Sequence, residues 1–102
     1  MTTLSSSLLD QIQRRPLVLA GAQQHTRLIA TRRLGIAQAK RAHPNWTADP
    51  AHRRAVLQAA QTYYAAHLDL RHYLSGVLHA LGIDFSGQDL AELTCAVEGL
   101  HT

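Results

Sequence analysis

The chain has 102 residues, of which 46% are hydrophobic, and a formal net charge of +3 with its seven histidines neutral. This length predicts a single domain over residues 1–102 with a modest core. Residues 1–16 lack the apolar segment of a signal peptide, no apolar run approaches the length of a membrane span, and a single cysteine excludes an intramolecular disulfide. We therefore expect a cytoplasmic protein without membrane contact.

Charge is divided unevenly along the chain. Residues 1–54 contain nine Lys or Arg and two acidic residues, a net of +7, whereas residues 55–102 contain one Arg and five acidic residues, a net of −4. Two interpretations stay open: an acidic partner or nucleic acid binds the first half, or the two halves neutralise each other within the fold or between subunits.

Helix signals divide the chain into four segments. A short helix is predicted at about residues 4–14, with one apolar face made of Leu4, Leu8 and Ile12. Pro16 ends that helix or opens the next one, which is predicted at about residues 16–43 and cannot continue through Pro44. Two glycines inside this second helix, Gly21 and Gly35, each cost about 1 kcal/mol relative to Ala, so we expect another helix to approach closely at both.

The second half of the chain carries clear start and stop signals. Asp49 followed by Pro50 predicts the start of a third helix, about residues 50–81, because Asp favours the N-cap and Pro the first helical position. Gly82 is its stop signal. Ser86 and Asp89 have the spacing of a capping box, which predicts a last helix at about residues 87–99.

Both long segments carry apolar positions in a 4-3 repeat. The first stripe is Val18, Ala22, His25, Ile29, Arg32, Ile36, Ala39 and His43, and the second is Val56, Ala60, Tyr63, His67, Leu70, Leu74, Val77 and Leu81. Matched stripes on either side of a short connector predict an all-α fold, an antiparallel helical hairpin with a short helix at each end. Folding the chain at the connector places Arg32 opposite Tyr63, where Arg32 stacks on the ring or reaches a carboxylate of another helix or subunit.

The third helix has more apolar positions than one neighbouring helix can cover, since Leu57, Tyr64, Leu68 and Leu78 widen its stripe. This surplus predicts a homodimer in which two hairpins form a helical bundle. The residues expected in dimer or helix packing are Tyr64, Leu68, Leu78, Arg32 and Tyr63.

No motif indicates catalysis, so we expect a protein that is not an enzyme and that has no catalytic residues, no cofactor and no metal. Asp69 and His72 have the i, i+3 spacing of a di-iron bundle ligand pair, but residues 17–43 contain no acidic residue to complete such a site. Cys95 is expected to be a buried, unreactive thiol.

Basic residues and one tryptophan gather around the connector and supply the candidate binding site: Arg33, Lys40, Arg41, Trp46, Arg53 and Arg54. Trp46 either folds back over the end of the hairpin or stays exposed as an anchor for a partner. We expect a small non-catalytic protein–protein interaction module of the adaptor, chaperone or inhibitor type. The alternative is a nucleic-acid-binding helical protein that uses the basic hairpin end.

A tryptophan, Trp46, in the central turn between two long helices of a 102-residue chain superficially resembles the WXG-motif secretion substrates. Thr47 and Ala48 follow Trp46, so the glycine of that motif is missing, and its C-terminal tyrosine motif is also missing. The resemblance covers length, hairpin form and one tryptophan, and no family is assigned from it.

Overall fold

The structure, a computed structural model, describes residues 4–100, with side chains from Ser7 onward. The described part is all-α, as predicted, and contains four helices: α1 (Leu4–Gln13), α2 (Pro16–Ala42), α3 (Pro50–Ala80) and α4 (Gly87–Glu98). Each helix ends one residue before its predicted end. Leu8 and Ile12 are buried on the predicted face of α1, whereas the side chain of Leu4 lies outside the described part.

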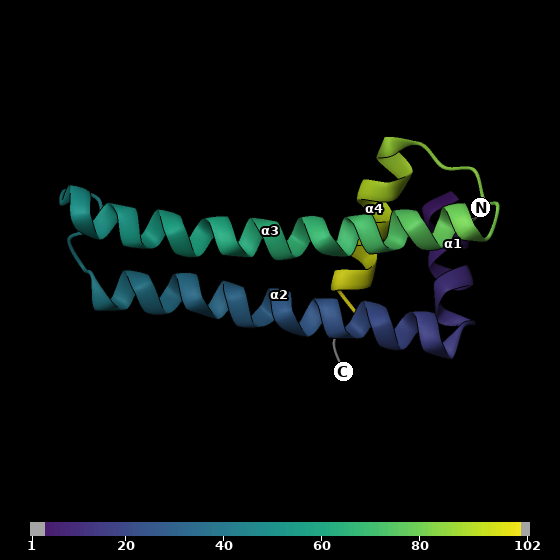
Figure 1. Ribbon diagram of the computed structural model, residues 1–102, viewed down its shortest axis with the longest axis horizontal. Helices are drawn as coiled ribbons and strands as arrows, with labels where there is room; N and C mark the ends of the chain where they lie inside the picture. Colours follow the sequence, from purple (N-terminus) through teal and green to yellow (C-terminus); the bar gives the residue numbers. More distant parts are fainter. Residues whose placement is uncertain (1–3, 101–102) are drawn as a thin grey trace.

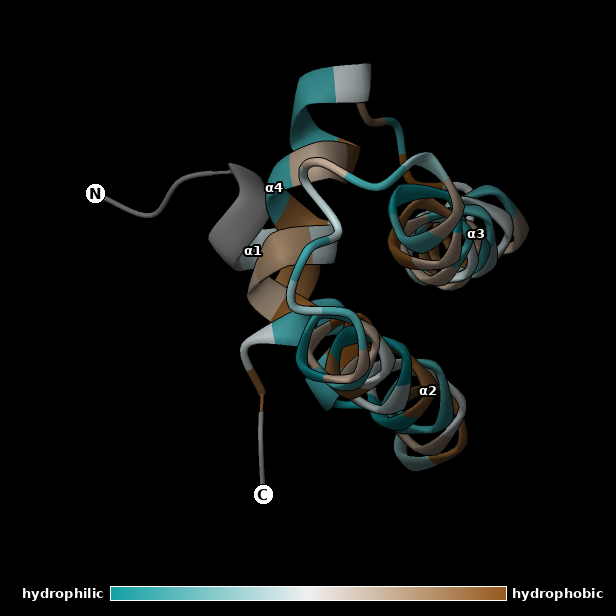
Figure 2. Ribbon diagram, turned by 90° about the vertical axis from the view of Figure 1, so that its left-hand side faces the viewer, coloured by the Kyte–Doolittle hydropathy of each residue, from teal (hydrophilic) through white to brown (hydrophobic). Residues whose placement is uncertain are grey.

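The two long helices, α2 and α3, run side by side in opposite directions and are joined by residues 43–49 (Figure 1). We call residues 40–54, at this connection, the tip. The short helices α1 and α4 lie next to each other across one face of the α2–α3 pair (Figure 2), at the end away from the tip (Figure 1). We call that end, where all four helices meet, the four-helix end. The molecule measures 49 × 26 × 25 Å.

Local hydrogen bonds explain where α3 begins and ends. Asp49 is the N-cap, and its Oδ1 accepts a hydrogen bond from the backbone N–H of Ala51 at 2.9 Å. At the other end Gly82 has a positive φ of 69°, and the backbone N–H of Ile83 donates to the carbonyl of Leu78. This pairing is a Schellman motif, in which glycine is favoured because it adopts the left-handed conformation without strain.

The capping box predicted for α4 is present in both directions. The hydroxyl of Ser86 accepts from the backbone N–H of Asp89 at 3.0 Å, and the carboxylate of Asp89 accepts from the backbone N–H of Ser86 at 2.9 Å. These bonds start α4 immediately after the loop that leaves α3, and this short loop keeps α4 at the four-helix end.

The apolar core lies at the four-helix end. Its buried side chains come from all four helices: Leu8, Ile12, Ala22, Ile29, Ala66, Leu70, Leu74, Leu78, Leu90, Leu93 and Val97. Nearer the tip, Val56 is the one buried apolar residue among those described. Most of the free energy from apolar burial therefore comes from the four-helix end, and the tip half is a pair of helices without a third layer.

The prediction that Arg32 lies between the two long helices, against Tyr63, is wrong. Arg32 is exposed, and the neighbouring Arg33 contacts Tyr63 instead: its guanidinium lies 5.6 Å from the ring centroid, and its Nη2 is 3.4 Å from the Tyr63 hydroxyl. Successive helical residues are rotated by about 100° about the axis, so an offset of one position exchanges a seam residue for a surface residue.

The apolar residues expected to be left over on α3 divide into two groups. Leu78 is fully buried because α1 and α4 complete the core around it. Leu57, Tyr64 and Leu68 remain exposed, at 54%, 69% and 49% of their full surface. Tyr63 is half-buried at the contact with Arg33. An uncovered apolar surface on α3 thus exists, but Leu78 is not part of it.

Two further expectations need correction. A Cβ atom at Gly21 would collide with Tyr73, as expected for a close helix approach, but a Cβ at Gly35 would meet no atom within 4 Å. Gly21 leaves room for the ring of Tyr73 from α3, whereas Gly35 has no neighbouring side chain or backbone to make room for. Cys95 is exposed rather than buried, because it lies on the side of α4 away from Leu93 and Val97.

Candidate interaction surface at the tip

Short-range hydrogen bonds define the shape of the tip. In the connector the backbone N–H of Trp46 donates to the carbonyl of His43, and the N–H of Asp49 donates to that of Asn45, at 3.0 and 2.9 Å. Arg53, from the first turn of α3, donates from Nη2 to the carbonyl of Thr47 at 2.6 Å. The connector is therefore held in one turn conformation from both sides.

Trp46 is half-buried at the tip, and the ammonium nitrogen of Lys40 lies 5.2 Å from the centre of its ring. This distance is within the range of a cation–π interaction. Because Lys40 covers one face of the indole, the ring is not free to be stacked from both sides. The observed state lies between the two sequence interpretations, a closed plug and a fully exposed anchor.

Two histidines, one on each side of the turn, lie close together at the tip. The rings of His43 and His52 have centroids 4.5 Å apart. His52 Nδ1 is buried without a hydrogen-bond partner, and it lies 3.8 Å from a carboxylate oxygen of Asp49, too far for a hydrogen bond. Asp49 therefore faces this imidazole while its other oxygen caps α3.

Four cations surround this turn, and all four are exposed: Lys40, Arg41, Arg53 and Arg54. Within the part of the chain that the structure describes, none of them has a carboxylate within 4.0 Å. Against them the tip holds one acidic residue, Asp49. The tip is thus a compact positive surface whose charge is not neutralised by the second half of the chain.

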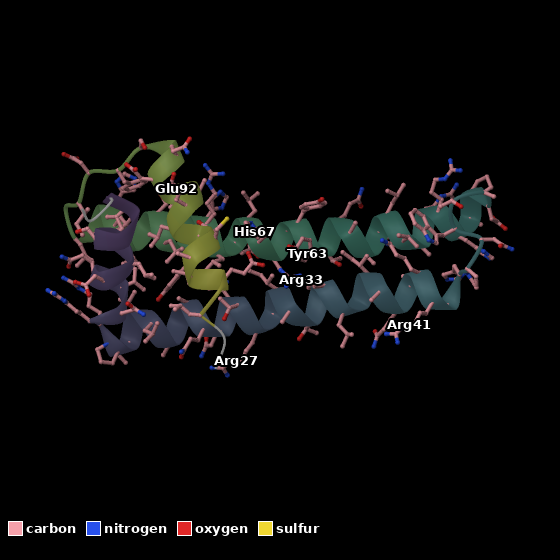
Figure 3. All side chains as sticks on the ribbon, turned by 180° about the vertical axis from the view of Figure 1, so that it is seen from behind. Arg27, Arg33, Arg41, Tyr63, His67 and Glu92 are labelled. Carbon is pink, nitrogen blue, oxygen red and sulfur yellow. The ribbon has the colours of Figure 1, made fainter. Side chains whose placement is uncertain are left out.

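Arg33, which the sequence grouped with the tip, belongs to a different cluster nearer the middle of the molecule (Figure 3). Its guanidinium makes an ion pair with Glu98 of α4, and the second carboxylate oxygen of Glu98 lies 3.0 Å from Nε2 of His67 on α3. The hydrogen bond to Tyr63 and, after it, the charge of Glu98 raise the pKa of Arg33. Arg33 therefore fastens α4 to the hairpin.

Sequence reasoning missed this cluster because its members are far apart in the chain. Arg33 and Glu98 are separated by 65 residues, and no periodic pattern relates them. The available signal was a polar residue, His67, in an otherwise apolar stripe of α3. The carboxylate of Glu98 is only 14% exposed, so it needs partners such as these.

The rest of the described chain offers less for recognition. A shallow groove of about 190 Å³ between α2 and α3 is lined by Leu28, Arg32, Thr62, Ala65, Ala66 and Asp69. Among the side chains from Ser7 to Leu100, no three of His, Cys, Asp or Glu come close enough to hold one metal ion. None of α1 to α4 combines the length and apolar character needed to cross a membrane.

Comparison with known proteins does not assign the chain to a family. No protein-family model matches it, and no significant similarity is found to a curated protein or to a solved structure. Function must therefore be inferred from the surfaces of the molecule itself.

The N-cap carboxylate of α3 makes the stability of the folded protein depend on pH. Hydrogen bonds from the backbone N–H groups of Ala51 and then His52 lower the pKa of Asp49 from its ordinary value of 3.8. A carboxyl group with a lowered pKa in the folded state contributes stability that is present above the unfolded-state pKa and lost as the pH falls through the folded-state pKa.

We therefore expect Asp49 to stabilise the fold more than Asn would at the same position, and we expect acid to abolish this difference in stability. The variant Asp49→Asn keeps an N-cap oxygen but lacks the charge, so its Tm should lie below that of the parent by a constant amount between about pH 5 and 7. The difference should begin to shrink as the pH falls below 3.8 and should disappear once the carboxyl group of Asp49 is protonated in the folded protein. Circular dichroism melts at a series of pH values measure it, and a difference that stays constant from neutral pH down to the most acidic pH at which the protein still folds would contradict the assignment.

Proposed function

We propose that the protein is a small non-catalytic interaction module whose tip binds an acidic surface of a protein. The observation that carries this proposal is the set of four exposed cations without carboxylate partners around one turn. Complementary charge accelerates association and disfavours the binding of wrong partners. An exposed positive surface on a turn of fixed shape can act on a partner in both ways. The proposal includes self-association, supported by the exposed Leu57, Tyr64 and Leu68 on α3.

The state of Trp46 favours a protein over a nucleic acid as the partner. Non-specific binders of single strands stack bases on exposed aromatic rings, whereas here Lys40 covers one face of a half-buried indole. Phosphate contacts remain available to the four cations, so nucleic acid is the second candidate. Neutralising about four phosphates predicts that log K falls with log salt with a slope of about −3 to −4.

The test compares charge reversal at two places on the hairpin. Arg41→Glu with Arg54→Glu reverses two tip charges, and Arg27→Glu with Arg32→Glu makes the same change in net charge in the middle of α2. All four residues are exposed. The probe is a fluorescently labelled peptide rich in Glu and Asp, followed by anisotropy, and an end-labelled DNA duplex is titrated in parallel.

We expect the tip variant to bind the acidic peptide about tenfold more weakly or worse, and the mid-hairpin variant to change affinity less than about threefold. Equal losses in the two variants would show that only net charge matters and would contradict a defined site. Tighter binding of the duplex than of the peptide, with the salt slope given above, would establish the nucleic-acid alternative instead.

A further inference from the structure

The tip carries one large apolar side chain among its charges. Trp46, the only tryptophan of the chain, is half-buried there and lies outside the apolar core of the four-helix end. Its turn is fixed, because its backbone N–H donates to the carbonyl of His43 and because Arg53 donates to the carbonyl of the next residue, Thr47. A tryptophan held in a defined surface position and not used by the core is suited to anchor a partner, since Trp is enriched in binding hot spots.

Lys40 covers this ring only loosely. Its ammonium nitrogen lies 5.2 Å from the ring centre, and the residue is exposed. At an exposed site a cation–π contact changes a population by about two- to fivefold, because water already solvates the cation. Lys40 therefore covers the ring for most of the time, yet a competing contact removes it easily.

The identity of the covering residue also favours a cover that can leave. Lys40 is the only lysine of the chain, beside nine arginines. An ammonium is a compact, strongly hydrated charge on a flexible stem, whereas a guanidinium stacks flat on an aromatic ring and holds it more firmly. Arg33 shows the firm arrangement, since it lies over Tyr63 and is held there by its ion pair with Glu98. Lys40 has no such second contact, because no described carboxylate lies within 4.0 Å of its ammonium.

We propose that the tip recognises an acidic segment of a protein that also contains an apolar side chain. A carboxylate of the partner draws the ammonium of Lys40 off the indole, and the apolar side chain packs on the ring face that this movement exposes. Arg41 and Arg54, which are exposed and unpaired with any described carboxylate, bind neighbouring carboxylates. The inference rests on the proposed binding of an acidic protein surface and specifies what that surface contains.

The same geometry disfavours a single-stranded nucleic acid as the occupant. Proteins that bind single strands stack successive bases on several aromatic side chains. The other aromatic rings of the tip, His43 and His52, are half-buried and lie with their centroids 4.5 Å apart. One exposed face of Trp46 receives one apolar side chain but does not provide a platform for a run of bases.

The first experiment compares two acidic peptides that differ in one side chain. Both consist of Glu and Asp around a central residue, Leu in one and Ser in the other, so their charges are equal. We expect the leucine peptide to bind about three- to tenfold more tightly in fluorescence anisotropy, the gain from burying part of one apolar side chain. Unlabelled leucine peptide should also shift the emission of Trp46 to shorter wavelength, and the serine peptide should not.

The variant Trp46→Ala should bind both peptides equally, with about the affinity of the parent for the serine peptide. The matched control, Tyr64→Ala, removes an exposed aromatic ring outside the tip and should keep the preference for leucine. Circular dichroism checks that both variants keep their helices. Equal binding of the two peptides by the parent, or a preference that survives Trp46→Ala, overturns the inference.

The second experiment tests the cover itself. In the free protein Lys40→Ala should raise the slope of acrylamide quenching of Trp46 by about twofold, because one ring face is then open. Arg41→Ala removes the same charge from the neighbouring position and should leave the slope unchanged. Lys40→Arg keeps the charge but covers the ring more firmly, so it should narrow the preference for the leucine peptide. An unchanged slope in Lys40→Ala overturns the inference.

A single-stranded oligonucleotide is the third probe. If it binds more tightly than the leucine peptide and quenches the emission of Trp46 by stacking, a nucleic acid takes the place of the acidic segment and the inference is overturned.

The two proposals fail separately. Equal binding of both peptides that is lost in the Arg41→Glu, Arg54→Glu variant supports the binding of an acidic surface and overturns the role of Trp46. A preference for leucine that depends on Trp46 but survives the charge reversal supports the anchor and overturns the binding of an acidic surface.

Discussion

Replacing Leu74 with Ala is expected to lower the free energy of unfolding by about 3 kcal/mol, within the usual range of about 2–5 kcal/mol for a buried leucine. Leu74 is fully buried in α3 at the four-helix end. The loss combines the transfer free energy of the removed methyl groups with the cavity that they leave. A domain of this size has about 5–15 kcal/mol of stability in total, so one substitution removes a large share of it.

Urea unfolding followed by circular dichroism measures this loss. The matched control is Leu17→Ala, which deletes the same atoms at a position 89% exposed and should change stability by less than about 0.5 kcal/mol. Similar losses for the two leucines would contradict the placement of the core at the four-helix end.

Substituting Ala for two glycines of the same helix is expected to change stability in opposite directions. At Gly21 a Cβ would lie 2.8 Å from Cζ of Tyr73 and would also collide with its hydroxyl oxygen. That ring cannot move easily, because its hydroxyl donates to the carbonyl of Val18 at 3.1 Å and its centroid lies 5.1 Å from the centroid of the His25 ring. We expect Gly21→Ala to cost about 1–3 kcal/mol despite the better helix propensity of Ala.

At Gly35 the added Cβ meets no atom within 4 Å, so Gly35→Ala should stabilise the protein by up to about 1 kcal/mol through helix propensity alone. Gly76 of α3 is equally open and gives a second case. Thermal and urea unfolding of the three variants test the contrast. Stabilisation by Gly21→Ala would show that α2 and α3 do not approach closely at Tyr73.

Predictions from sequence succeeded where the governing interactions are local. The N-cap at Asp49, the stop at Gly82 and the capping box of Ser86 and Asp89 each act within three to five residues of backbone, so residue identity and spacing are sufficient to find them. The exposure of the four tip cations follows from their charge and their place next to a polar turn.

Predictions were weaker where two segments meet. The pairing of α2 with α3 was expected to place Arg32 against Tyr63, and the structure places Arg33 there. A close approach of another helix was expected at both Gly21 and Gly35. Of these two glycines, only Gly21 has a neighbouring helix close to it. Periodicity identifies the apolar stripe of a helix but leaves its rotation uncertain by about one residue, or about 100°, and that rotation decides which side chains touch.

By itself the sequence determined four helices with their ends to within one residue, a positive segment around the connector and an excess of apolar residues on α3. Only the tertiary structure decided that α1 and α4 cover one half of one face, that Leu78 is buried while Tyr64 is not, and that Glu98 holds Arg33 and His67. Caps and helix propensities act between neighbours in the chain. Burial depends on packing between segments as far apart as residues 33 and 98, which no local pattern specifies.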